Sequence, residues 1–201
     1  MIDSVTDVEQ RVIGIDEVGR GSWSGPLVAC AILLKSSILN YSNLGLIDDS
    51  KKIKKKKRVE LSNFIKKHSY FSFGIAYVEE IDNQNINIAT KFAVTRAYKK
   101  FNNLNTIIKI DGKKIFEFKK NTHFLIKGDQ KSIAIASASI LAKVFRDEIM
   151  EYLDYYYPEY GWKSNVGYGT KKHLQAIKKF GITKFHRKSF KPIAKFIQSN
   201  R

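Results

Sequence analysis

Residues 11–34, RVIGIDEVGRGSWSGPLVACAILL, place two apolar segments on either side of a glycine-rich stretch. The first segment, residues 11–15, alternates branched apolar side chains and is predicted to be a buried strand that ends at Asp16. Residues 27–34 are apolar throughout and predict a second buried strand. The intervening GRGSWSGP is too short and too rich in glycine for a helix, so it predicts a loop or a hairpin between the two strands.

The rest of the chain mixes strand and helix patterns. Aromatic and β-branched residues predict a third strand at 70–78, and shorter strands are expected at 106–110 and 123–126. Apolar residues at helical spacing predict helices at 52–67, 85–101, 132–156 and 170–180, and Pro192 is expected to open a last one. This order predicts an α/β domain with a mixed sheet, and the absence of repeats or linkers predicts one domain over residues 1–201.

Charge and cysteine content narrow the class of protein. The 201 residues carry a formal net charge of +17, which favours a polyanionic partner and above all nucleic acid. The single cysteine, Cys30, excludes an intrachain disulfide and a zinc–thiolate cluster. The longest apolar run, residues 27–34, is far shorter than the roughly 20 residues of a membrane helix. A soluble, cytoplasmic protein is therefore expected.

Acidic residues follow three of the predicted strands. Asp16 and Glu17 come after the first strand, Asp111 follows the strand at 106–110, and Asp129 comes shortly after the strand at 123–126. Carboxylates that converge at one edge of a sheet repel one another unless a cation lies among them, and an all-oxygen site favours Mg²⁺ or Mn²⁺. The alternative is that Asp111 starts a turn with Gly112 and that Asp129 caps the long helix.

Gly19-Arg20-Gly21 directly follows the Asp16-Glu17 pair. Glycines allow the backbone to approach a ligand closely and expose its N–H groups, and Arg20 could contact a phosphate. Taken without its neighbours, the same tripeptide favours a plain turn, and its position directly after Asp16-Glu17 is what favours a ligand-binding loop.

Seven further segments occur in an order that resembles the ribonuclease HII family, whose opening signature is similar to IGIDEVGRGSWSGPLV. They are DDSKK (48–52), NINIAT (85–90), IDG (110–112), KGD (127–129), SASILAKVFRD (137–147), GYGT (167–170) and HRKSF (186–190). The resemblance implies an RNase H-like fold, a mixed five-stranded sheet flanked by helices with a small C-terminal helical extension at about 160–201. It also implies an endonuclease that hydrolyses the RNA strand of RNA–DNA hybrids and cuts 5′ to ribonucleotides embedded in duplex DNA, leaving 5′-phosphate and 3′-hydroxyl ends.

The resemblance also implies roles for individual residues. Asp16, Glu17, Asp111 and Asp129 would be the catalytic metal ligands for Mn²⁺ or Mg²⁺, with Asp16 bridging two ions in a two-metal-ion hydrolysis. Because neighbouring residues on a regular strand point to opposite faces, Asp16 and Glu17 are expected to share a site only where the strand ends or bulges. Substrate would be bound by the loop backbone at the ribose 2′-OH, by Tyr168 at the following deoxyribose, and by the Asp-Ser-Lys-Lys segment; the residues are Gly19, Arg20, Gly21, Tyr168, Ser50, Lys51 and Lys52.

Two segments depart from the family pattern. Ser22-Trp23-Ser24 stands where Pro-Leu-Ala or a similar triplet is usual, and Asn165-Val166 stands where a lysine or histidine often precedes Gly-Tyr. Since all four acids are present, we expect an active enzyme whose substrate preference can differ from that of its relatives.

Other polar and aromatic residues are assigned no catalytic role. Asp147 is expected either at a helix surface or behind the metal ligands as a supporting residue. His173 and His186 are expected on the polar surface, with a supporting position behind the ligands as the alternative. The tyrosines near the end of the long helix are expected to pack there, with stacking on bases as the alternative; they are Tyr152, Tyr155, Tyr156 and Tyr157.

Two rival functions remain open. Ribonuclease HIII shares the acid pattern, but it usually carries GTG in place of Gly19-Arg20-Gly21 and an extra N-terminal domain. A non-catalytic nucleic-acid binder is the other rival, against which the four acids count. A monomer is expected, and the resemblance adds a sliding clamp as a candidate partner for the tail at 191–201.

Overall fold

A computed structural model describes residues 4–47, 50 and 52–199. At its centre lies a five-stranded sheet in the order β3-β2-β1-β4-β5. Strand β1 pairs antiparallel with β2 and parallel with β4, β2 pairs antiparallel with β3, and β4 pairs parallel with β5. The strands are β1 (Ile13–Val18), β2 (Leu27–Leu34), β3 (Ser69–Ala76), β4 (Ile108–Asp111) and β5 (Thr122–Leu125). The sheet is therefore mixed, as predicted.

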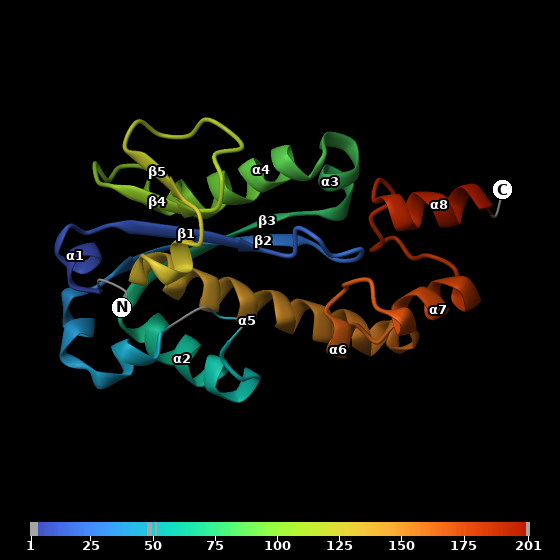
Figure 1. Cartoon of the computed structure of the whole chain (residues 1–201), viewed down its shortest axis with the longest axis horizontal. Helices are drawn as coiled ribbons and strands as arrows, with labels where there is room; N and C mark the ends of the chain where they lie inside the picture. Colours follow the sequence, from blue (N-terminus) through green and yellow to red (C-terminus); the bar gives the residue numbers. More distant parts are fainter. Residues whose placement is uncertain (1–3, 48–49, 51, 200–201) are drawn as a thin grey trace.

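Helices cover both faces of this sheet. Figure 1 shows α3 and α4 on one face and α2 and α5 on the other, with α6, α7 and α8 gathered beyond the sheet. The helices are α1 (Ser4–Glu9), α2 (Lys55–Lys67), α3 (Val78–Gln84), α4 (Ile86–Tyr98), α5 (Ile133–Tyr156), α6 (Trp162–Asn165), α7 (Lys171–Phe180) and α8 (Lys191–Ser199). Within the described ranges, no helix is long and apolar enough to cross a membrane.

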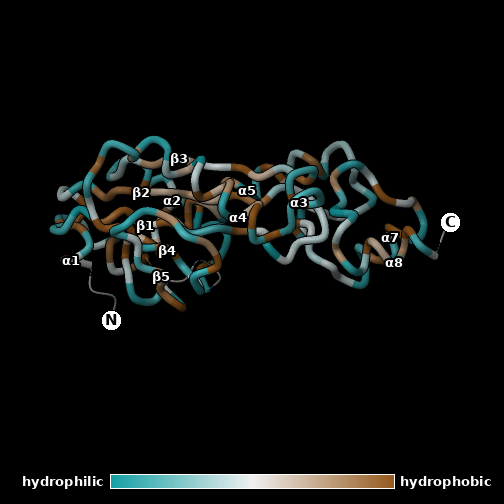
Figure 2. Tube along the Cα trace, turned by 90° about the horizontal axis from the view of Figure 1, so that it is seen from above, coloured by the Kyte–Doolittle hydropathy of each residue, from teal (hydrophilic) through white to brown (hydrophobic). Residues whose placement is uncertain are grey.

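Strand β2 is buried along its whole length because it is covered on both faces. Its odd-numbered side chains pack with Ala89, Ala93 and Val94 of α4, and its even-numbered ones pack with Ile140 and Leu141 of α5. Alternation along one strand thus supplies two separate cores. Figure 2 shows the apolar colour along β1 and β2 between more polar outer segments.

Helix α5 crosses the sheet closely because its first turns are slim. A Cβ on Gly14 of β1 would lie 2.2 Å from the main-chain carbon of Ala134, so this approach requires glycine. The helix is capped by the Ser132 hydroxyl, which accepts the N–H of Ile135 at 3.2 Å. The alternative in which Asp129 caps this helix is therefore wrong, although the helix itself is confirmed.

Two predicted boundaries are also wrong. Strand β1 does not end at Asp16 but continues to Val18, because its pairing with β2 runs on through Asp16–Cys30 and Glu17–Ala29. The helix expected at 85–101 begins only at Ile86 and follows a separate helix, α3. Asn85 separates the two with a φ of +89°, and its side chain accepts the N–H groups at the start of α4.

The C-terminal helices form their own apolar cluster at the end of α5. Trp162, Tyr160 and Ile177 are buried in it, together with His173 and His186. The expectation that these histidines lie on the polar surface is wrong, because the 160–193 segment folds over them. Figures 1 and 2 place this part of the chain at the end of the molecule opposite α1.

Candidate active site

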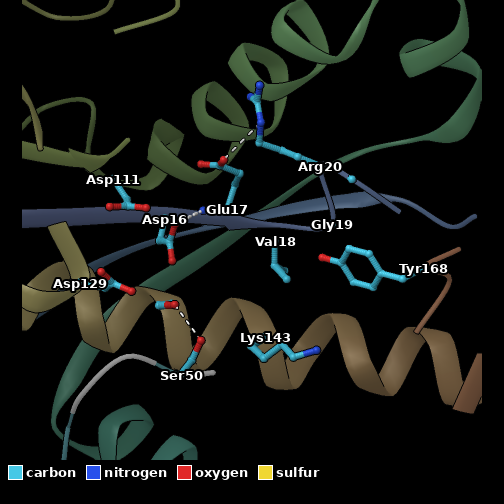
Figure 3. Close-up of a pocket in the computed structure, with 12 residues that line it drawn as sticks. Asp16, Glu17, Val18, Gly19, Arg20, Ser50, Asp111, Asp129, Lys143 and Tyr168 are labelled. Carbon is cyan, nitrogen blue, oxygen red and sulfur yellow. Dashed lines mark hydrogen bonds and ion pairs between the residues drawn. The ribbon is translucent and has the colours of Figure 1, made fainter. Parts of the chain in front are cut away.

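A cavity lined by charged and polar side chains opens where β1 and β4 part. Strand β4 pairs with β1 only as far as Ile15, so the edge of β1 from Asp16 to Val18 is unpaired on that side. The cavity has a volume of about 520 Å³. Figure 3 shows the residues that line it. It is lined by Asp16, Glu17, Val18, Gly19, Arg20, Gly21, Ser50, Asp111, Asp129, Ser139, Lys143 and Tyr168. The structure thus brings the four acids together with the glycine–arginine loop, Ser50 and Tyr168.

Asp16 lies at the buried end of this cavity, with 7% of its surface exposed. Burial raises its pKa well above the usual range, and the negative charges of Glu17 and Asp111 raise the pKa further. The Ser139 hydroxyl and the N–H of Glu17, at 2.7 Å, hydrogen-bond the carboxylate and partly offset that effect. Asp16 is therefore a carboxylate that a nearby cation would stabilise.

Glu17 points the other way, as alternation along β1 requires. Its carboxylate lies 3.7 Å from Nε of Arg20, and Figure 3 shows it turned toward that side chain. The Arg20 guanidinium is in turn held by Thr90 Oγ1 at 2.7 Å and Asn87 Oδ1 at 2.9 Å. Strand β1 neither ends nor bulges at these acids, because it pairs regularly with β2 through both. Both side chains line the cavity because β4 pairs with β1 only as far as Ile15, but they point apart, so a shared metal site stays a prediction.

Asp111 and Asp129 are brought together by the turn that follows β5. Asp111 is the last residue of β4, and its carboxylate accepts the N–H of Gly128 at 2.6 Å. Lys127 has a φ of +56°, which turns the chain so that Asp129 faces the cavity from a short 3₁₀ turn. The alternative reading of Asp111 as a turn residue holds as well, because Gly112 follows it with a φ of +93°.

The four acids form an all-oxygen donor set, but their side chains are not yet gathered around one point. Across the described residues, no three His, Cys, Asp or Glu side chains lie close enough together to hold a metal ion. Glu17 is turned to Arg20 and Asp111 to Gly128, which accounts for the open arrangement. The donor chemistry nevertheless suits Mg²⁺ or Mn²⁺, and the repulsion that raises the pKa of Asp16 is what such an ion would relieve.

Gly21 and Tyr168 face each other across the mouth of the cavity. A Cβ on Gly21 would lie 3.7 Å from the Tyr168 ring, and that ring is exposed. The backbone of Tyr168 is fixed on both sides, since its N–H donates to the Asn165 carbonyl at 2.9 Å and its carbonyl lies 2.9 Å from Nδ1 of His173.

Of the Asp-Ser-Lys-Lys segment, Ser50 lines the cavity. Ser50 is buried, and its hydroxyl lies 2.9 Å from that of Ser139 on α5. Lys51 lies outside the described residues. Lys52 is described and exposed, but the cavity-lining residues of the described chain do not include it.

Sequence reasoning missed Ser139 and Lys143. Both lie on α5 four residues apart, so they share one helix face, and that spacing inside residues 137–147 was the available signal. Lys143 Nζ lies 2.7 Å from Asp147 Oδ1. Asp147 is buried, because this ion pair and the packing of α5 cover it. The helix-surface alternative is therefore wrong, and a supporting role behind the metal ligands stays a prediction.

Trp23, which departs from the family pattern, supports the segment that carries Tyr168. A Cβ on Gly169 would lie 2.0 Å from the Trp23 ring, so the indole fills the space that a glycine leaves. The Trp23 ring also lies 5.7 Å from that of His173.

His173 and His186 form a buried pair behind this segment. Their Nε2 atoms lie 3.2 Å apart, and Nε1 of Trp162 donates to His173 Nε2 at 3.2 Å. Burial lowers the pKa of His173, while burial and the neighbouring His173 lower the pKa of His186 to about 3. Both rings are therefore neutral supports of the Tyr168 segment rather than acids or bases of the site.

The tyrosines at the end of α5 differ from the expectation. Tyr157 packs against Trp162 and Phe185 as expected. Tyr152, Tyr155 and Tyr156 are exposed, so the prediction that they pack is wrong for these three.

Comparisons with known proteins agree on one family. The family model described as Ribonuclease HII matches residues 13–193. A ribonuclease HII of Pelagibacter ubique is 47% identical over 182 residues, covering 90% of this chain and 96% of that protein. A ribonuclease HII of Staphylococcus aureus is 51% identical over 183 residues, covering 90% of this chain and 70% of that protein.

Solved structures share the fold at lower identity. The Archaeoglobus fulgidus RNase HII, solved in a complex with PCNA, matches with a TM-score of 0.74 at 24% identity, covering 90% of this chain and 95% of that one. The ribonuclease H2 of Pyrococcus horikoshii also has a TM-score of 0.74 at 24% identity, covering 94% and 97%. Bst-RNase HIII, solved in complex with Mn²⁺, has a TM-score of 0.71 at 17% identity, covering 99% and 74%. The predicted RNase H-like fold is thereby confirmed.

Proposed function

The chain belongs to the ribonuclease HII family, and from this premise we propose that it cuts duplex DNA on the 5′ side of an embedded ribonucleotide. As a ribonuclease HII it is an RNase H enzyme, an endonuclease that acts on nucleic acid. The observation that carries the finer proposal is that the four acids, the loop at 19–21 and Tyr168 line one cavity. We take residues 1–201 as one catalytic domain that acts as a monomer in the cytoplasm.

The four acids would hold Mn²⁺ or Mg²⁺; they are Asp16, Glu17, Asp111 and Asp129. Bound there as a pair, these divalent ions would supply the charge that stabilises the attacking and leaving oxygens of the phosphodiester. The Mn²⁺ complex of the Bst-RNase HIII relative supports this choice of ion. For Glu17 to join the other three, its carboxylate has to leave Arg20, which the 3.7 Å separation between them permits.

The mouth of the cavity would select the substrate. The N–H groups at residues 19–21 would recognise the ribose 2′-OH, and the exposed Tyr168 ring would lie against the next deoxyribose. A substrate with a ribose followed by a deoxyribose would satisfy both contacts at once. Arg20 and Lys143 would face the phosphates. Ser50, Lys51 and Lys52 are proposed as further substrate-binding residues.

Two observations weigh against the rival functions. Arg20 stands between the two glycines and bonds to α4, whereas ribonuclease HIII usually has GTG at this place. A binder without catalysis gives no reason for a buried Asp16 that two neighbouring carboxylates destabilise.

A sliding clamp is the protein partner that we propose. The Archaeoglobus RNase HII was solved with PCNA, and the corresponding contact here would use the tail at 191–201. Ile193 is buried against the C-terminal cluster, so the contact would use the outer side of α8. Loss of clamp binding on deletion of residues 194–201, measured by calorimetry with the purified clamp, would support this partner, and unchanged binding would reject it.

The test of the proposed function compares two buried aspartates. Asp16→Asn removes a proposed ligand. Asp147→Asn changes an equally buried aspartate that is not among the cavity-lining residues of the described chain, although its partner Lys143 is. We expect Asp16→Asn to abolish cleavage of a duplex with one ribonucleotide in Mg²⁺ or Mn²⁺. Asp147→Asn should remain active, and a chelator should stop both the wild type and this control. Metal-dependent cleavage by Asp16→Asn would overturn the proposal.

A further inference from the structure

Two segments that form the mouth of the cavity come from distant parts of the chain. The loop at 19–26 follows β1, and the turn at 166–168 precedes α7. Their backbones touch, because the N–H groups of Trp23 and Ser24 both donate to the carbonyl of Gly167, at 2.8 and 3.2 Å. The relative position of loop and turn therefore fixes the spacing between residues 19–21 and Tyr168.

The buried side chain of Arg146, on α5, bonds to both segments. Toward the loop, its Nε donates to the Pro26 carbonyl at 2.9 Å, and Nη2 donates to Ser22 Oγ at 2.9 Å and the Ser24 carbonyl at 3.1 Å. Toward the turn, Nη1 donates to the Val166 carbonyl at 2.9 Å. A planar guanidinium with donors in several directions can span these acceptors, whereas the ammonium of a lysine cannot.

The acceptors of Arg146 are unusual for a buried cation because all four are neutral. Among the hydrogen bonds of the described residues, none joins its guanidinium to a carboxylate. Burial lowers the pKa of Arg146, which shows that this environment disfavours the charge. A cation held at such a cost, at the junction of two site segments, indicates a role in their placement.

The backbone around Arg146 is shaped to receive it. Gly19 has a φ of +95°, and a Cβ there would lie 2.3 Å from the Arg146 Nε. The Arg146 guanidinium can therefore occupy this position only because residue 19 has no side chain. Val166 has a φ of +44°, a left-handed conformation that is strained for a β-branched residue, and its carbonyl accepts from Arg146. The Tyr168 ring centroid lies 6.0 Å from Arg146 Cζ.

We propose that Arg146 is a positioning residue, which fixes the loop at 19–21 relative to Tyr168 and thereby sets the preference for a ribonucleotide–DNA junction. This inference rests on the proposed function, in which the loop recognises one sugar and Tyr168 recognises the next. Arg146 touches neither sugar. It acts by holding the two recognition elements one sugar step apart.

Arg187 provides a matched control, because its side chain bonds to the same loop at 19–26. It is also fully buried; its Nε and Nη2 donate to the Gly25 carbonyl at 3.0 and 2.9 Å, and its Nη1 donates to the Arg20 carbonyl at 3.0 Å. Within the described chain, its side-chain hydrogen bonds go to the loop and none goes to the turn at 166–168. Arg187→Lys therefore removes a buried guanidinium of comparable size and leaves the Arg146 bond to the turn at 166–168 in place.

The first measurement is hydrogen exchange by mass spectrometry on the full-length protein, without substrate. We expect Arg146→Lys to speed exchange in peptides covering both 19–25 and 166–170, and Arg187→Lys to do so at 19–25 alone. Ser22→Ala, which removes one acceptor of Arg146, is the milder variant should Arg146→Lys fail to fold. Unchanged exchange at 166–170 in a folded Arg146→Lys or, failing that, in Ser22→Ala overturns the proposal.

The second measurement is the ratio of kcat/KM for a single-ribonucleotide duplex to that for an all-RNA hybrid. We expect Arg146→Lys to lower this ratio by about tenfold to a hundredfold, the size that a misplacement of about 1 Å produces. In a Tyr168→Ala background the same substitution should change the ratio little, because the group that it positions is gone. An unchanged ratio, or an equal loss with and without Tyr168, overturns the proposal.

The two measurements separate this inference from the function on which it rests. A wild type that does not prefer the single-ribonucleotide duplex overturns the proposed function. Exchange needs no substrate, so it still decides whether Arg146 links loop and turn.

Discussion

Asp16→Asn is predicted to make the protein more stable when metal is absent. Asp16 is buried, and its charge is disfavoured by burial and by the neighbouring carboxylates of Glu17 and Asp111. Asparagine has nearly the same size, and its carbonyl can still accept the N–H of Glu17 that Asp16 accepts at 2.7 Å. The substitution therefore removes the repulsion while keeping the hydrogen bond.

The size of the gain follows from ordinary stability relations. Relief of unfavourable charge at a functional site typically raises the free energy of unfolding by about 0.5–2 kcal/mol. For a chain of this length, 1 kcal/mol corresponds to about 2–4 °C in Tm, so we expect Tm to rise by a few degrees. With divalent metal, the wild type should instead be the more stable of the two proteins. An ion at 100 times its Kd stabilises the wild type by about 2.7 kcal/mol, whereas the variant lacks one of the proposed ligands and binds the ion more weakly.

Thermal unfolding in chelator and in a Mn²⁺ titration measures both effects. In chelator, the variant should melt above the wild type, and in saturating Mn²⁺ it should melt below. Asp147→Asn serves as the control, because losing the ion pair with Lys143 should not raise Tm in chelator, and Mn²⁺ should still stabilise the protein. A lower Tm for Asp16→Asn in chelator, or an equal Mn²⁺ shift in variant and wild type, would refute the reasoning.

Three further predictions concern the surroundings of the site. The lowered pKa of His186 means that the folded protein binds fewer protons than the unfolded chain below about pH 6.5, so stability falls as pH drops from about 6.5 toward 3. From pH 8 to pH 5 this ring should cost about 2 kcal/mol in urea unfolding; an unchanged loss in His186→Gln would contradict this origin. Gly169→Ala should lower the free energy of unfolding by about 1–3 kcal/mol, measured by thermal unfolding, because the new Cβ crowds the Trp23 ring. The loss should be smaller in a Trp23→Ala background. If the losses of the two single variants simply add in the double variant, this packing is contradicted. Lys143→Met should lower the slope of log K for duplex binding against log salt by about 0.9, measured in chelator, whereas an unchanged slope would show that Lys143 neutralises no phosphate.

Local patterns in the sequence predict the sheet and the long helix well. Residues 27–34 form β2 as predicted, and the helix predicted at 132–156 begins one residue later. Residues 27–34 are apolar throughout, and residues 133–156 carry apolar side chains at helical spacing, so each pattern fits the element that it forms. The four acids could also be predicted as cavity-lining residues, because each comes at or shortly after the end of a strand predicted from the sequence and a family motif contains it.

Other features depend on partners that are distant in the chain. The end of β1 was predicted wrongly, because its length follows from pairing with β2 and the loop glycines alone suggest an earlier end. His173 and His186 carry no local sign of burial, since the cover comes from residues 160–193. The role of Arg146 could not be predicted from the sequence, because its acceptors are a serine and backbone carbonyls. Every residue has a backbone carbonyl, so such partners cannot be recognised by residue type. Lys143 was missed for a related reason: its place in the cavity depends on where α5 crosses β1.

The most direct test of the account is the position of the cut in an end-labelled DNA duplex that contains one ribonucleotide. The wild type is incubated with Mg²⁺ or Mn²⁺ beside an all-RNA/DNA hybrid and plain DNA, and a parallel series contains chelator. The account predicts a single cut 5′ to the ribonucleotide, leaving a 3′-hydroxyl and a 5′-phosphate, with no cut in plain DNA or in chelator. Cleavage of the hybrid without cleavage of the single-ribonucleotide duplex would contradict the roles given to residues 19–21 and Tyr168.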